Sequence, residues 1–282
     1  MKRLFFFSAI ILLLGCRDNA EEKVTPPQPE LLQQPYGTAY TLTDSQKFIY
    51  DHTALPEITV EMNAAEWNKF LNYYDQNPNN EEYVSGKFTF LKNGTTEILD
   101  NIGFRLKGNT SRRRPEGNSG EIHNSTNPDW HHASFTVSFK KFNKTQLFHQ
   151  SEKLVLKWFK DDAMYAREVF SYDLFEKLGV WTAPQSSYCR LTIKITGDAK
   201  AAYFGVYQMI EPVDDAFLAN RSSFFTTTGN LWKANWGASL KDPSINNMGI
   251  EDVTLTYTNT PIYDYKGSKS NLAAAKTQLS DF

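Results

Sequence analysis

Residues 104–114 read Phe-Arg-Leu-Lys-Gly-Asn-Thr-Ser-Arg-Arg-Arg, and this stretch joins a strand pattern to a basic turn. Arg105 and Lys107 alternate with two apolar residues, so a strand would place both cations on one face. The following turn could present backbone N–H groups beside arginine forks, a combination that suits phosphate oxygens. The pattern predicts either an anion site or a solvated basic loop after an ordinary strand, and these residues alone leave both open.

Strand and helix patterns extend on both sides of this stretch. Asn63 is expected to cap a helix with Glu66 as its capping-box partner. Asp161 and Asp162 are expected to begin another helix, which Gly179 ends. The chain therefore predicts an α+β fold with a mixed or antiparallel sheet, with strands at 55–62, 83–91, 97–107, 133–139, 153–159, 187–195, 202–210 and 229–234.

The N-terminus has the pattern of a bacterial lipoprotein signal. A short basic region precedes the apolar run Leu4–Leu14, which is too short to span a bilayer as a helix. Gly15 and Cys16 follow, so we expect cleavage before Cys16 and lipidation of that cysteine; the alternative is a plain secretory signal with an incidental cysteine. The predicted organisation is a signal peptide at 1–15, a lipidated cysteine and flexible tether at 16–50, and a folded domain at 51–282. This places the protein in the bacterial cell envelope, at the outer membrane or cell surface.

Composition narrows the possible functions. The chain is 40% hydrophobic and 14% aromatic, as expected of a globular domain. Its net charge of −2 argues against general nucleic-acid binding. Cys189 is the one cysteine besides Cys16, and its apolar strand pattern predicts a buried thiol. The histidines show no metal-ligand spacing, so no metal site is predicted and His131 and His132 are interpreted as structural.

Several segments together resemble the spore-coat protein H (CotH) kinase family over roughly residues 55 to 240. They are Leu55-Pro56-Glu57-Ile58, Arg105 to Arg112, His132 to Phe135, Asp162 with Ala166-Arg167-Glu168, Lys177 to Val180, Gly205 to Glu211, Phe217-Leu218 and Gly229 to Ala234. The resemblance implies an atypical protein-kinase-like fold, ATP with Mg or Mn, and phosphorylation of serine on secreted or surface proteins.

The resemblance also implies cofactor-binding residues. A helix glutamate, Glu168, would pair with a nucleotide-binding lysine, or else form an exposed salt bridge. Relatives carry Lys-Lys-Ser-Phe where this chain has His131 to Phe135, so Lys107 and Lys157 are the substitutes for that lysine. Arg105 is the candidate phosphate contact. Glu211 would be either an acid near the ribose or the cap of the next helix. Lys233 would be a pocket or a surface residue.

No catalytic residue is assigned from the sequence. In the family the proton-accepting and metal-binding acids follow the Gly229 to Lys233 segment, in a helical large lobe. Asp242 and Asn247 reproduce a D-x-x-x-x-N spacing, which we interpret as chance. We expect the large lobe to be largely missing, the chain to be truncated, and this chain to be inactive alone.

Two other functions compete with a kinase. The first is a non-catalytic binding or adhesion lipoprotein that uses exposed aromatic residues such as Trp130, Trp232 and Trp236. The second is a glycan-binding or glycan-cleaving lipoprotein, which ranks last because no convincing carboxylate pair is present. The expected partners are a surface or secreted protein substrate and the membrane that holds the lipid on Cys16.

Overall fold

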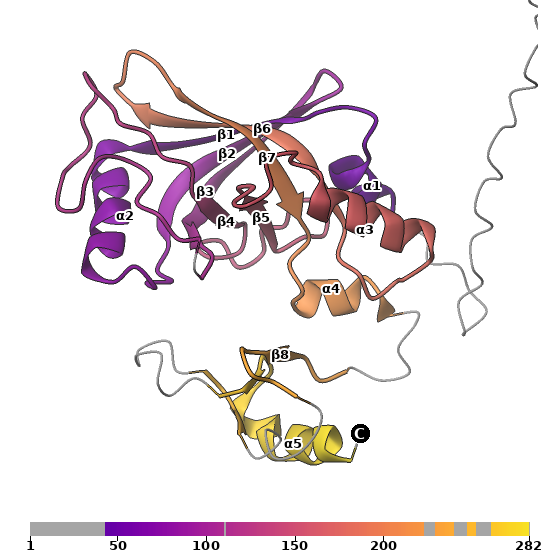
Figure 1. Cartoon of the computed structure of the whole chain (residues 1–282). Coiled ribbons are helices and arrows are strands. Elements are labelled where there is room, and N and C mark those ends of the chain that lie inside the picture. Colours follow the sequence, from indigo (N-terminus) through magenta and orange to yellow (C-terminus); the bar gives the residue numbers. More distant parts are fainter. Residues whose placement is uncertain (1–42, 110, 223–228, 240–246, 252–260, 282) are drawn as a thin grey trace, which may run out of the picture. The chain divides into compact units, whose positions relative to one another are not determined.

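The computed structural model describes residues 43–109, 111–222, 229–239, 247–251 and 261–281. Within these ranges seven strands form a closed barrel in the order β1-β2-β3-β4-β5-β7-β6 (Figure 1). The expected signal peptide and Cys16 lie outside the described residues. The barrel strands are β1 (Glu57–Asn63), β2 (Val84–Lys92), β3 (Thr95–Lys107), β4 (Ser134–Ser138), β5 (Lys153–Lys157), β6 (Ser186–Thr196) and β7 (Ala202–Ile210).

One parallel pairing closes the barrel. β1 runs parallel to β6, with Glu57 opposite Arg190 and Asn63 opposite Thr196, whereas the other neighbouring barrel strands are antiparallel. The predicted mixed sheet in an α+β chain is therefore confirmed. Closure into a barrel was not predicted, because the pattern of a strand does not show which distant strand its free edge will pair with.

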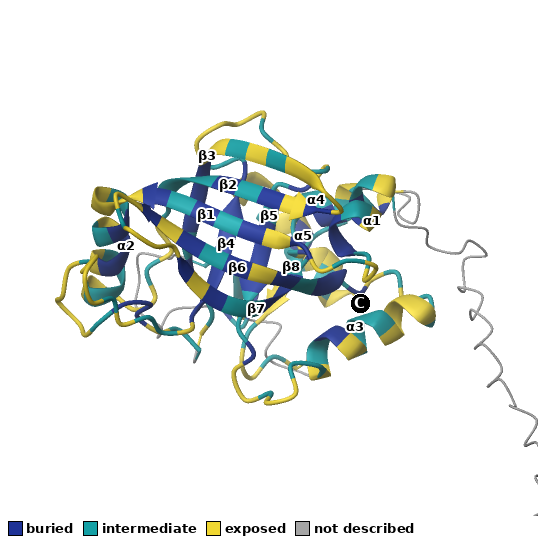
Figure 2. Cartoon of the chain, turned by 90° about the horizontal axis from the view of Figure 1, so that it is seen from above, coloured by how far each residue is buried: buried dark blue, intermediate teal, exposed yellow. Residues whose placement is uncertain are grey.

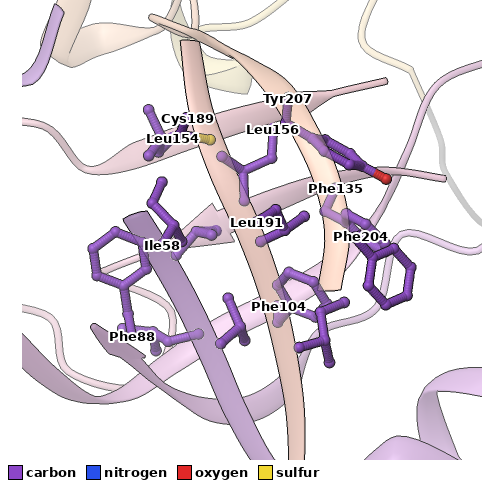
Figure 3. Close-up of a cluster of buried hydrophobic side chains, with 14 of the residues drawn as sticks. Ile58, Phe88, Phe104, Phe135, Leu154, Leu156, Cys189, Leu191, Phe204 and Tyr207 are labelled. Atoms are coloured by element: carbon purple, nitrogen blue, oxygen red, sulfur yellow. The ribbon is translucent and has the colours of Figure 1, made fainter. Parts of the chain in front are cut away.

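The barrel interior is filled by aromatic and aliphatic side chains (Figure 3). The ring of Phe104 stacks on that of Phe135 at 4.8 Å between centroids, and Phe70 reaches Phe104 at 5.5 Å. Cys189 is fully buried among them, as predicted, and burial raises the pKa of its thiol. Burial of one face of each strand leaves the alternate residues of β3, β4 and β5 on the outside of the barrel.

Helices lie at the two ends of the barrel. α2 (Ala64–Gln76) lies at one end, and α1 (Asp44–Tyr50) and α3 (Arg167–Lys177) lie at the other (Figures 1 and 2). The side chain of Asn63 caps α2 by accepting a hydrogen bond from the backbone N–H of Glu66 at 2.8 Å. The Glu66 carboxylate does not complete the predicted capping box. It instead accepts from the backbone N–H of Ser85 at 2.7 Å and ties the helix to β2.

α3 begins later than the sequence predicts. Asp161 and Tyr165 have φ angles of 64° and 56°, which no helix accommodates, so the helix starts at Arg167. The Asp162 side chain still accepts from the backbone N–H of Arg167, at 2.8 Å. The predicted end of the helix is confirmed by Gly179, whose φ is 70°.

The described residues after the barrel form short elements. α4 (Asp215–Ala219) follows β7. A small sheet orders its strands β8-β10-β9, from β8 (Trp232–Ala234), β9 (Met248–Gly249) and β10 (Tyr263–Tyr265). The 3-10 helix η4 (Lys269–Asn271) leads into α5 (Leu272–Ser280), where Ala275 is buried. In the described part of the chain, no helix has the length and apolar character needed to cross a membrane.

Candidate functional site

A cavity of about 950 Å³ lies against the outer face of β3, β4 and β5. Strand register brings its wall together, because Arg105 lies opposite Thr136 and Lys107 lies opposite Ser134, while Thr136 lies opposite Val155 on the next strand. All five of these side chains line the cavity. The apolar side chains between them point into the barrel core, so the cavity wall is as fixed as the core itself.

The cofactor-binding residues predicted from the sequence surround this one cavity. Two come from β3, one from β5, one from α3 and one from the position directly after β7, so four separate segments of the chain contribute. They are Arg105, Lys107, Lys157, Glu168 and Glu211.

Lys157 and Glu168 form an ion pair between the end of β5 and the first turn of α3. A carboxylate in a helix's first turn is favoured by the N-terminal end of the helix dipole. The side chains are 38% and 42% exposed, so the pair is open to the cavity rather than sealed. Tyr172 lies one turn further along α3 and also lines the cavity; burial, and then the charge of Glu168, raise the pKa of its hydroxyl. Lys157 is therefore the lysine that pairs with Glu168, and this contact fits both the predicted pairing with a nucleotide-binding lysine and the alternative of an exposed salt bridge.

Arg105 lies at the other end of the wall. Its Nη1 donates to the carbonyl of Leu106 and pairs with Glu81, each at 3.1 Å, and its guanidinium lies 5.2 Å from the centre of the Tyr83 ring. Its Nε is buried and has no hydrogen-bond partner among the described residues.

Lys107 lies on the same face of β3 as Arg105 and also lines the cavity. Among the described residues no carboxylate forms an ion pair with it. Burial, followed by the charges of Arg105, Lys157 and Lys233, lowers the pKa of its ammonium group, although the charge of Glu81 opposes this shift. Burial and the three neighbouring cations penalise the charged lysine, so an anion in the cavity would relieve these effects.

The turn after β3 contributes backbone to the cavity, but its arginines do not. Gly108, with a φ of 115°, lines the cavity together with Asn109 and Ser111. Arg112 instead donates to the carbonyls of Pro78 at 3.1 Å and Asn80 at 2.8 Å.

Arg114 is buried and holds Asp75 through two contacts of 2.8 and 3.0 Å. Only Arg113 of the three arginines is exposed. The three arginines therefore do not line the cavity, whereas Arg105 and Lys107 of the same stretch do. Arg112 and Arg114 anchor the loop, which sequence reasoning missed because their acceptors are distant in the chain.

Glu211 lines the cavity, but its carboxylate is occupied by internal partners. Arg221 donates from Nη1 and Nη2 to its two oxygens at 3.0 and 2.8 Å. Gln46 and the backbone N–H of Gln185 each add a hydrogen bond of 3.1 Å. The expectation that Glu211 caps the next helix is wrong, since Asp214 makes the capping bonds of α4.

Sequence reasoning missed further residues of the cavity. Lys153 lies on the same face of β5 as Lys157 and pairs with Asp214 at 3.1 Å. The four-residue spacing of the two lysines in a strand would have revealed their shared face. Lys233, left open as a pocket or surface residue, lines the cavity and is 55% exposed.

The described residues provide cations for an anion but no metal cluster. Within the five described ranges, no group of three or more His, Cys, Asp or Glu could hold a metal ion. Asp242 of the D-x-x-x-x-N spacing lies outside these ranges. His131 pairs with Asp129 at 3.1 Å and His132 stacks on Trp158 at 3.6 Å, which agrees with structural roles.

The expected exposed tryptophans differ from one another. Trp130 packs on Trp67 at 5.9 Å, and Trp232 packs on Tyr265 at 4.9 Å, so both are partly buried. Trp236 alone of the three is exposed, at 99%. The exposed aromatic surface suggested by the sequence is therefore smaller than expected.

Comparison with known proteins gives one family match. The family model described as CotH kinase protein matches residues 105–281. The matched region begins within β3 and runs through α5, so it includes Arg105, Lys107, Lys157 and Glu168. Comparison with curated proteins finds no match.

Proposed function

Because the chain belongs to the CotH kinase protein family, we propose that its cavity binds the triphosphate of ATP and that the protein serves phosphoryl transfer to serine hydroxyls of secreted or surface proteins. The observation that carries this proposal is the Lys157–Glu168 pair on the wall of a cavity that Arg105 and Lys107 also line. Kinases use a strand lysine held by a helix glutamate to orient phosphate groups.

Each cation of the wall has a distinct part in this proposal. Lys157, held by Glu168, offers one ammonium group to a bridging phosphate oxygen. Arg105 offers a planar guanidinium, which suits two oxygens of one phosphate. A bound phosphate places a negative charge near Lys107 and so stabilises the protonated form of this lysine. Gly108 lets the backbone of the turn run close beside these groups.

The described residues do not provide a complete metal site for a nucleotide. When bound, Mg or Mn neutralises phosphate charge during transfer. Without a cluster of carboxylates in the described ranges, we assign no metal ligand here and derive no step through a metal. We likewise assign no residue as the acceptor of the serine proton.

For location, we propose a lipid anchor at Cys16 in the bacterial envelope. The support is the apolar run Leu4–Leu14 followed by Gly15-Cys16. Incorporation of labelled palmitate that is lost in Cys16→Ser would support the anchor. Equal labelling of the two forms would contradict it.

The test of nucleotide binding is calorimetric titration with ATP, first with EDTA and then with Mg or Mn. We expect Lys157→Met to weaken ATP binding by about tenfold or more, the loss of a charge-assisted contact. Lys177→Met is the matched control, because Lys177 lies on α3 but pairs with Asp173 in solvent, with 61% of its side chain exposed. Transfer of labelled phosphate to serine peptides would test catalysis separately.

The competing binding function makes the opposite prediction. If the folded wild-type protein binds no ATP under either condition, nucleotide chemistry is refuted. The exposed Trp236 would then be the first residue to test for a surface-binding role.

A further inference from the structure

The end of the cavity at β3 has more cations than acids. Arg105 and Lys107 line this end, and Glu81 is the one carboxylate among the described residues that forms an ion pair with either of them. A single oxygen, Oε1 of Glu81, lies 3.1 Å from both Arg105 Nη1 and Arg112 Nη2. Arg112 holds the backbone beside Glu81 in place, so its guanidinium is already engaged.

Glu81 can leave this position without disrupting an element. It lies between α2 and β2, outside any helix or strand, and its side chain is 44% exposed. In contrast, the Arg105 side chain is 15% exposed and projects from a strand of the barrel. The carboxylate is therefore the movable partner and the guanidinium is the fixed one.

Arg105 has more donors than its surroundings use. A guanidinium offers five N–H groups, yet the buried Nε has no acceptor among the described residues. The neighbouring Lys107 has no carboxylate partner there either. A tetrahedral anion with several oxygens could bind the terminal N–H groups of Arg105 and the ammonium group of Lys107 together, which the single Glu81 oxygen does not do.

We infer that Glu81 competes with the phosphate groups of the ligand for Arg105, and so sets the affinity of this end of the cavity for polyphosphates. When a phosphate binds, the carboxylate moves into solvent, and Arg105 exchanges one anionic partner for another. The inference rests on the proposed function only for the nucleotide as natural ligand. The competition itself concerns any polyphosphate.

The test is calorimetric titration of the full chain with inorganic tripolyphosphate and with ATP, at fixed low salt. Glu81→Gln keeps the size and hydrogen bonding of the side chain but removes its charge. One unit charge close to the bound anion at an intermediate effective dielectric predicts about 3- to 10-fold tighter tripolyphosphate binding. Glu82→Gln is the matched control, an exposed neighbour outside the cavity, and should change binding by less than about twofold.

A double-variant cycle locates the effect. In an Arg105→Met background the Glu81→Gln substitution should tighten binding by a clearly smaller factor, because the contested guanidinium is gone and only the direct repulsion between Glu81 and the anion is left to remove. Equal tightening with and without Arg105 would overturn the inference. Weaker binding in Glu81→Gln would also overturn it, since that would make Glu81 a support for Arg105 rather than a competitor.

The two ligands separate this inference from the proposed function. If the wild type binds tripolyphosphate and Glu81→Gln binds it more tightly, while neither binds ATP, the competition is supported and the nucleotide proposal fails. If ATP binds equally to wild type and Glu81→Gln, the nucleotide proposal stands and the competition is refuted. If neither variant binds tripolyphosphate, the anion site at Arg105 is refuted.

Discussion

Replacement of Arg221 by methionine would leave a buried carboxylate without its cation. The Arg221 side chain is fully buried and that of Glu211 is 5% exposed. Arg221 makes two bonds to Glu211 and further bonds to the carbonyls of Trp181 at 2.7 Å and Ala183 at 3.1 Å. One side chain therefore joins the end of β7 to the segment before β6.

The expected cost of Arg221→Met is about 3 to 5 kcal/mol, the range for breaking a buried ion pair by removing one partner. At a urea dependence of about 2 kcal/mol per molar, the unfolding midpoint would fall by roughly 1.5 to 2.5 M. Circular dichroism during urea titration at pH 7 measures this shift. From the described residues, the Glu211 carboxylate would retain only the hydrogen bonds from Gln46 and Gln185.

A second substitution distinguishes charge from packing. Adding Glu211→Gln to Arg221→Met removes the stranded charge and should recover at least about 1 kcal/mol. Arg190→Met is the matched control, because Arg190 and Glu57 are each about half exposed and 3.4 Å apart. Its expected cost is below about 1 kcal/mol. A loss below about 1 kcal/mol in Arg221→Met, or no recovery in the double variant, would refute the reasoning.

Three other perturbations follow from the barrel. His123 lies between Glu116 at 2.8 Å and Asp198 at 3.0 Å; burial opposes its charge, but hydrogen bonds to both acids outweigh burial and raise its pKa. The charged His123 side chain therefore stabilises the fold fully below the unfolded-state pKa of about 6.5. This stabilisation is lost as pH rises through the higher folded-state pKa. In urea titrations at pH 5.5, the free energy of unfolding of the wild type should exceed that of His123→Gln by about 1.5 to 3 kcal/mol. A difference that is unchanged at pH 9 would contradict this. Phe135→Ala, at a fully buried position, should cost about 3 to 5 kcal/mol in the same assay, and a loss under about 1 kcal/mol would argue against its place in the core. In a Cys16→Ser background, Cys189 should react with a thiol reagent only after unfolding, because it is fully buried; prompt reaction in native buffer would show an open barrel.

Local patterns predicted the strands well, because both the cause and the signal lie within a few residues. The strand predicted at 202–210 is found as β7 (Ala202–Ile210), and the hairpin predicted across Lys92 to Gly94 joins β2 and β3. The predicted start of α3 was wrong because Asp161 and Tyr165 adopt positive φ, which the sequence pattern around them does not indicate. The pairing of β1 with β6 could not be predicted, since it depends on which distant edges remain free.

The candidate site was predictable where a single element presents a face. Alternation on β3 placed Arg105 and Lys107 together, and both line the cavity. The internal engagement of Arg112, Arg114 and Glu211 was not predictable, because their partners lie in other elements and include backbone carbonyls. A carbonyl that accepts a hydrogen bond leaves no trace in residue identity.

The parallel pairing of β1 and β6 also bears on the order in which the chain can fold. Glu57 and Arg190, which face each other across that pairing, are 133 residues apart. A ribosome at about 5 to 20 residues per second would need roughly 7 to 27 seconds to make that interval. During this time β1 can pair with β2, but its other edge remains unpaired. An unpaired strand edge promotes association with other chains. We therefore expect either that a chaperone protects β1 or that the pairing of β1 with β6 is a slow, late step of folding.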